Sequence, residues 1–137
     1  MPTTPSDPRT QVILAAAFEV HTQLGPGFEE VFYQRALARE FSVRNLDFGR
    51  EIEIPVRYKG EELGSKRIDF IVEDILLEIK ATTALEPVHL AQALSYLRAS
   101  GRRIGLLLNF GAPKLQIKRL IHGYDLHVRG MEPPLDG

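Results

Sequence analysis

The hydrophobic positions follow a helical period in the first third of the chain and a strand period after it. Apolar residues recur three or four positions apart over residues 8–23 and 29–45, which predicts two amphipathic helices separated at Gly25-Pro26-Gly27. Over residues 48–58 apolar and polar residues alternate, which predicts a half-buried strand. Because Pro55 has no backbone N–H to donate, we expect this strand at a sheet edge or at a bulge.

The next segments predict a tight hairpin and then a strand-helix-strand unit. Residues 66–72 and 75–81 have the pattern of two strands joined at Glu73-Asp74. A helix follows from Pro87 to a glycine stop at Gly101, and residues 104–110 form an almost continuous apolar run, typical of a strand buried on both faces. A crossover helix places that strand parallel to the one before it.

The order of elements predicts the fold class. It is an α/β domain with a mixed central sheet, and we expect it to span residues 1–130, with residues 131–137 as a flexible tail. Residues 115–121 fit either a short helix or a strand.

The hairpin gathers its charged side chains on one face. If the turn is symmetric, Asp69 lies opposite Glu78 and Arg67 lies opposite Lys80. The other face is then wholly apolar, with Ile68, Phe70 and Val72 against Ile75, Leu77 and Ile79. Two carboxylates with Cβ atoms roughly 5 Å apart destabilise a strand pair unless a cation compensates them. A divalent metal site is one interpretation, and an ordinary cross-strand cluster of surface ion pairs is the other.

The chemistry of this face favours Mg²⁺ or Mn²⁺. Carboxylate oxygens are hard ligands, and these cations keep several waters while binding one or two carboxylates together with a substrate phosphate. A lysine beside such a cation, here Lys80, can orient or deprotonate an attacking water and can offset charge in the transition state.

Composition narrows the range of functions. The 137 residues include no cysteine, which excludes disulfides, thiolate metal sites and cysteine nucleophiles and fits a reducing, cytoplasmic location. Neither an export signal nor a membrane span is evident, so we expect no membrane association. The net charge of -1 does not by itself indicate a nucleic-acid partner, so that case depends on the site.

Three motifs carry a resemblance to known proteins. Asp69 followed by Glu78-Ile79-Lys80 resembles the signature of the PD-(D/E)XK nuclease superfamily, with Ile68 in place of the proline of its name. Gln92 and Tyr96 resemble the Gln-x-x-x-Tyr element of its RecB-like branch. The stretch from Gly27 through Glu30 to Tyr33 is similar to the element that names the GxxExxY proteins.

The resemblance implies a fold and a set of roles. The fold is a restriction-endonuclease-like core, namely a helix, a three-stranded antiparallel meander, a helix and a parallel strand, with an extra N-terminal helix. Its implied catalytic residues are Asp69, Glu78, Lys80, Gln92 and Glu30; its substrate contacts are Tyr96, Arg67 and Tyr33; its metal ligands are Asp69, Glu78, Ile79 through its carbonyl, and Glu30.

Each of these roles has a structural alternative. Glu30 could be a helix N-terminal acid favoured by the dipole, and Gln92 and Tyr96 could belong to a solvated helix face. We interpret His21 as a partly buried structural histidine rather than a ligand.

The sequence therefore predicts a metal-dependent nuclease that hydrolyses DNA, using Mg²⁺ or Mn²⁺ as cofactor. A non-catalytic module of the same fold that binds nucleic acid or a protein partner is one alternative, and an RNA or nucleotide phosphodiesterase is another. Because the chain is little more than the core, the resemblance also implies a homodimer or a protein partner that supplies specificity.

Overall fold

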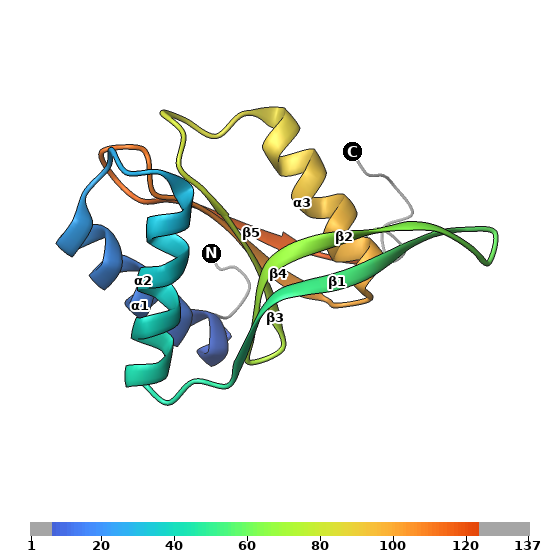
Figure 1. Cartoon of the computed structure of the whole chain (residues 1–137), viewed down its shortest axis with the longest axis horizontal. Coiled ribbons are helices and arrows are strands. Elements are labelled where there is room, and N and C mark those ends of the chain that lie inside the picture. The colour runs from blue at the N-terminus through green and yellow to red at the C-terminus, as the bar shows by residue number, and fades with distance from the viewer. Residues whose placement is uncertain (1–6, 124–137) are drawn as a thin grey trace, which may run out of the picture.

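The computed structural model describes residues 7–123, which form three helices and five strands (Figure 1). In chain order these are α1 (Pro8–Leu24), α2 (Glu30–Val43), β1 (Phe48–Tyr58), β2 (Glu61–Val72), β3 (Ile75–Lys80), α3 (Pro87–Ser100), β4 (Ile104–Asn109) and β5 (Gln116–Ile121). The predicted α/β fold, with a restriction-endonuclease-like core and an extra N-terminal helix, is confirmed. The tail expected at residues 131–137 lies outside the described residues.

All five strands belong to one mixed sheet in the order β1-β2-β3-β4-β5. Only the β3–β4 pair is parallel, as the crossover through α3 requires, and the other pairs are antiparallel. The segment after Gly111, for which the sequence left two alternatives, is the strand β5, paired with β4.

Helices cover both faces of the sheet, so each face has its own core (Figure 1). One core joins α1 and α2 to the sheet and contains Ile13, Ala16, Ala17, Val20, Tyr33, Leu37, Phe41, Phe70, Val72, Ile75, Leu77, Ile79, Leu106, Leu108 and Phe110. The other joins α3 to the sheet and contains Ile54, Ile68, Leu76, Ala93, Leu97, Leu107 and Leu120. The described helices include none with the length and apolar character that a bilayer span needs.

Strand β2 is longer than the sequence predicted, because it starts at Glu61 rather than at Lys66. Its first half pairs with β1 through a two-residue turn at Lys59-Gly60, whose φ values of 49° and 84° are those of a hairpin turn matched to the strand twist. We call residues 52–58 and 61–68 the hairpin arm, which extends away from the other strands in Figure 1. Its tip is exposed on both faces, so the apolar alternation that marks a half-buried strand is absent there.

The two strands of the arm enter the sheet at an irregular point. Ile68 packs in the α3 core, whereas Phe70 packs in the core under α1 and α2, although strict alternation would put both on one face. Opposite this step Glu51 has a φ of 52°, a left-handed conformation in the middle of β1. The prediction of one continuous apolar face from Ile68 to Val72 is therefore wrong, because the apolar side chains of β2 change from one face of the sheet to the other at Asp69.

A buried asparagine ties together the loops that follow β3 and β4. The Asn109 side chain accepts hydrogen bonds from the backbone N–H groups of Thr82 (2.9 Å) and Gly111 (3.0 Å). Its amide nitrogen donates to the Thr82 carbonyl (2.9 Å) and to the Gln116 side chain (2.8 Å). Asn109 is fully buried and uses its donors and acceptors on these loops, which identifies it as a structural residue.

Candidate metal centre

The hairpin places Asp69 beside Glu78 where the β2–β3 ladder ends. The ladder has three pairs, Phe70–Leu77, Ile71–Leu76 and Val72–Ile75, and these confirm the predicted register. Beyond them, side chains replace the backbone hydrogen bonds. The Asp69 N–H donates to the Glu78 carboxylate (3.0 Å), and the Ile79 N–H donates to the Asp69 carboxylate (2.7 Å).

Both carboxyl groups are difficult to ionise in this position. Burial, reinforced by the nearby Asp69 carboxylate, raises the pKa of Glu78 to about 8. Burial also raises the pKa of Asp69 to about 6, although the hydrogen bond from the Ile79 N–H opposes this rise. Glu78 is only 6% exposed. Two desolvated acids that lie side by side favour a bound cation, because positive charge between them would stabilise both ionised forms.

Lys80 and helix α3 form one side of the site. The Lys80 ammonium lies 3.3 Å from the side-chain oxygen of Gln92, to which it donates. It also opposes the rise in the pKa of both buried acids. The pKa of the Tyr96 hydroxyl is raised by burial and then by the charges of Glu78 and Asp69. The structure thus brings Gln92 and Tyr96 to the same site as the hairpin acids.

Helix α2 forms the other side of the site. Burial raises the pKa of Glu30, and the Lys80 charge opposes that rise, so the Glu30 carboxyl faces the same charges as the hairpin acids do. Gln34 connects the helix to β2, since its amide nitrogen donates to Glu30 (3.1 Å) and to Asp69 (3.1 Å). Gln34 was not predicted as a site residue; its only signal in the sequence was its place four residues after Glu30, on the same helix face.

Two residues with expected substrate contacts lie elsewhere. Arg67 pairs with Glu53 of β1 (3.5 Å) rather than standing opposite Lys80, because the β2–β3 ladder ends before it. Tyr33 is fully buried; its hydroxyl donates to the Gly25 carbonyl (2.5 Å) and accepts from the Phe28 N–H (3.2 Å). Both residues thus have structural partners, and their substrate-binding roles stay predictions.

Two histidines near these elements have structural contacts. His21 lies 3.0 Å from the Ala112 carbonyl and beside the ring of Phe110, in agreement with the structural interpretation. The His89 side chain accepts a hydrogen bond from the Glu86 N–H (3.0 Å) and completes the N-terminal cap of α3.

The donor set fits Mg²⁺ or Mn²⁺ as partial ligation and not as a closed cage. Among residues 7–123, no three Asp, Glu, His or Cys side chains converge closely enough to hold a metal ion together. Asp69 and Glu78 supply two carboxylates, and the Gln34 amide links Glu30 to Asp69. Mg²⁺ commonly binds one or two carboxylates and completes its shell with water and substrate phosphate, which matches this arrangement.

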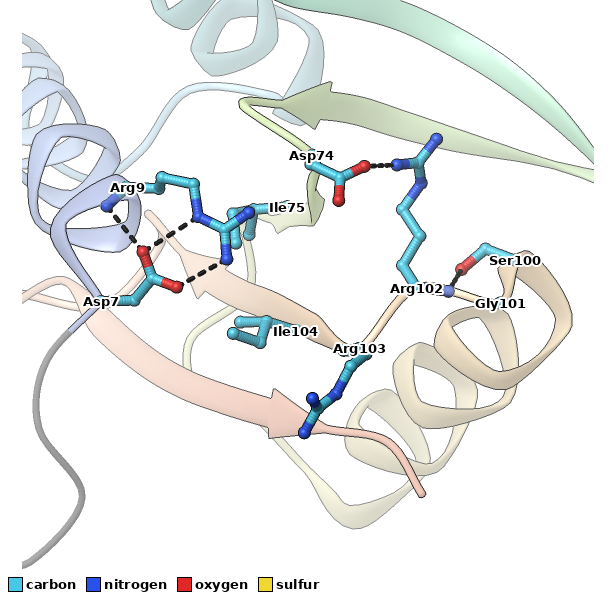
Figure 2. A pocket seen from close by; sticks show the side chains of 9 residues that line it. All are labelled: Asp7, Arg9, Asp74, Ile75, Ser100, Gly101, Arg102, Arg103 and Ile104. Carbon is cyan, nitrogen blue, oxygen red and sulfur yellow. Dashed lines mark hydrogen bonds and ion pairs between the residues drawn. The ribbon is translucent and has the colours of Figure 1, made fainter. Parts of the chain in front are cut away.

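A cavity of about 500 Å³ lies apart from these residues, between the start of α1, the β2–β3 turn and the end of α3 (Figure 2). Figure 2 shows the ion pairs Asp7–Arg9 and Asp74–Arg102 on opposite sides of Ile75 and Ile104. The Arg9 guanidinium lowers the pKa of Asp7 to about 2. These carboxylates are already compensated by arginine, so the cavity lacks the uncompensated charge that distinguishes the Asp69 site.

Comparison with known proteins agrees with this fold. Residues 7–120 match the family model described as the PD-(D/E)XK nuclease superfamily. The chain is also similar to a solved structure titled "Crystal structure of SSO0001", with 16% identity, coverage of 87% of this chain and 80% of that chain, and a TM-score of 0.45. No curated protein matches the chain.

Proposed function

The chain belongs to the PD-(D/E)XK nuclease superfamily, whose members are typically metal-dependent, and we propose that it hydrolyses DNA phosphodiester bonds with Mg²⁺ or Mn²⁺ held by Asp69 and Glu78. The observation that carries the proposal is the pair of buried carboxyl groups whose ionisation is unfavourable in the metal-free protein. A structural ion-pair cluster would instead match each acid with its own base, as Asp7 is matched with Arg9.

The Ile79 carbonyl is a further proposed ligand. In an extended strand the N–H and C=O of one residue point to the same side. The Ile79 N–H points at Asp69, whereas the next carbonyl, that of Lys80, accepts from Phe110 on the β4 side (2.8 Å). The Ile79 carbonyl is thus directed toward the gap beside Asp69, which supports this role.

The remaining residues have distinct proposed tasks. A divalent cation at this position would supply an activated water and would polarise the scissile phosphate. Lys80 would orient that water and offset negative charge on the phosphate as the bond breaks, while Gln92 holds the lysine side chain in place. Glu30 would act through an intervening water, and the Tyr96 hydroxyl would contact the substrate.

We also propose membership of the GxxExxY proteins within the RecB-like branch of the superfamily. The three named positions have separate structural roles that support the grouping. Gly27 has a φ of 120°, a conformation that favours glycine, Glu30 faces the site, and Tyr33 anchors the turn between α1 and α2. The motif therefore combines one residue of the site, Glu30, with two residues that fix the loop before it, Gly27 and Tyr33.

The test is cleavage of single-stranded, duplex and branched DNA in Mg²⁺ or Mn²⁺ by the wild type, Asp69→Asn and Lys80→Ala, with the exposed Lys66→Ala of the hairpin arm as control. We expect metal-dependent products from the wild type and the control, and loss of products from both site variants. Cleavage of RNA alone would contradict the DNA assignment. Metal binding without products on any substrate would instead favour a binding module.

A further inference from the structure

Gln34 makes a contact that links two parts of the site from different layers of the fold. It lies on α2, one turn after Glu30, and its amide nitrogen is 3.1 Å from a Glu30 oxygen and 3.1 Å from an Asp69 oxygen. A side-chain amide has two N–H donors, and this geometry uses one on each carboxylate. Both donors of Gln34 are therefore committed to acids of the candidate metal centre.

The contact differs from an ordinary glutamine-glutamate pair on a helix, and the chain contains such a pair for comparison. In α1, Gln23 donates to Glu19 over 3.0 Å with the same four-residue spacing, and that pair is exposed. Gln34 is part-buried and reaches a residue 35 positions away on another element. The Gln23 contact is an ordinary pair on a solvent-exposed helix face. The contact between Gln34 and Asp69 has no such explanation, because it joins two different elements.

The second contact reduces the electrostatic repulsion between two acids of the site. The Glu30 and Asp69 carboxylates both accept from the Gln34 amide nitrogen over 3.1 Å, so their negative charges lie close together and repel one another when both are ionised. A neutral donor shared by Glu30 and Asp69 offsets part of that repulsion without adding a positive charge that would compete with a metal cation. Each carboxylate oxygen has two lone pairs, so Asp69 can accept from Gln34 and still bind a cation.

We propose that Gln34 is a positioning residue of the metal centre: its amide holds the Glu30 and Asp69 carboxylates together, so that the site is already assembled when a divalent cation arrives. This inference rests on the proposed metal-dependent function. Residues that hydrogen-bond to metal-ligating carboxylates commonly change metal affinity about 10- to 100-fold when removed. We expect a loss in that range for a variant of Gln34 that cannot donate.

The experiment measures Mn²⁺ affinity by the loss of the free-ion electron paramagnetic resonance signal. Gln34→Met preserves the length of the side chain and removes both donors; Gln23→Met removes the matched helical pair outside the site. We expect weaker Mn²⁺ binding, about 10-fold or more, in Gln34→Met and an altered spectrum of the bound ion. Gln23→Met is expected to match the wild type in both measurements, and thermal unfolding without metal checks that both variants remain folded.

A double-mutant cycle with Glu30→Gln separates this role from a general effect on folding. If Gln34 acts by holding Glu30, its removal has a smaller effect on Mn²⁺ affinity once Glu30 has lost its charge. Mn²⁺ affinity within twofold of the wild type in Gln34→Met, together with loss of binding in Asp69→Asn, would overturn this inference and leave the proposed function standing. Absence of Mn²⁺ binding by the wild type would overturn both.

Discussion

Asp69 donates its backbone N–H to the Glu78 carboxylate over 3.0 Å, so the strand that carries one acid holds the other acid in place. The reverse contact is made one residue further along β3, where the Ile79 N–H donates to the Asp69 side chain. The two acids therefore complete the hairpin as well as forming the site. Substitutions that keep an acceptor oxygen, Asp to Asn and Glu to Gln, test the chemistry with the least change to the hairpin.

Removing the Glu78 charge is expected to stabilise the metal-free protein at high pH. A carboxyl group whose pKa rises from 4.5 to about 8 on folding keeps its proton in the folded state after the unfolded chain has lost it. The loss of folding stability that Glu78 causes is therefore absent below about pH 4, grows as the pH rises, and is nearly complete by about pH 8. Glu78→Gln should be more stable than the wild type at pH 8 by about 2 kcal/mol or more, and nearly equal at pH 4.

Urea unfolding at pH 4, 6 and 8 with a chelator present measures this difference. Addition of Mg²⁺ at pH 8 is expected to stabilise the wild type and to leave Glu78→Gln unchanged, since the cation binds only the folded wild-type site. A stability difference that does not vary with pH would contradict the assignment of the cost to Glu78 ionisation.

Lys80→Met is expected to separate catalysis from metal binding. Loss of the ammonium should slow DNA cleavage about 100-fold or more, since the attacking water and the phosphate lose their nearby positive charge. Mn²⁺ affinity should be unchanged or higher, because a cation that repels the metal has been removed. Single-turnover cleavage and Mn²⁺ titration measure the two effects, and an equal loss of both would show that Lys80 supports the fold of the site instead.

Tyr33→Phe is expected to lower stability without affecting the metal centre. The variant removes a buried hydroxyl and leaves the Gly25 carbonyl and the Phe28 N–H without this partner, which costs about 1–3 kcal/mol. Thermal unfolding measures the loss, and the stacking of the ring on Phe110 should be retained. If the variant kept its stability and bound DNA more weakly, Tyr33 would have a substrate role after all.

Gly111→Ala is expected to destabilise the fold strongly. A Cβ at this position would lie 2.4 Å from the Thr82 carbonyl oxygen and 2.5 Å from the Thr82 nitrogen, two atoms that hydrogen bonds to Asn109 hold in place. Gly64→Ala is the matched control, because a Cβ there meets nothing within 4 Å. Thermal unfolding should show a large loss for the first variant and a small change for the second; similar melting temperatures would mean that the Thr82 loop can move aside.

The hairpin register was predictable because it depends on local features. A two-residue turn and the alternation on either side of it bring Asp69 and Glu78 together whatever the rest of the chain does. The change of face along β2 at Asp69 was not predictable, because it depends on the left-handed conformation of Glu51 and on where α3 packs.

The contribution of α2 to the site was predictable only in part. The motif resemblance indicated Glu30, but Gln34 four residues later has the pattern of a solvated helix pair. Its contact with Asp69 depends on how α2 docks over the sheet, which the burial of Leu37 and Phe41 determines. The hydrogen bonds of the Tyr33 hydroxyl to the loop before α2 were not predictable either, because they depend on how that loop folds back over the helix.

The hairpin arm ends in a tip whose length the packed part of the sheet does not fix. Its strands pair with each other, its base packs against α3, and its tip, residues 57–67, is exposed. Residues added in pairs at the Lys59-Gly60 turn would lengthen the reach of the arm while leaving Asp69 at the same place in the sheet. Under the proposed function, two chains that differ only in this arm would share one site and admit different nucleic-acid shapes.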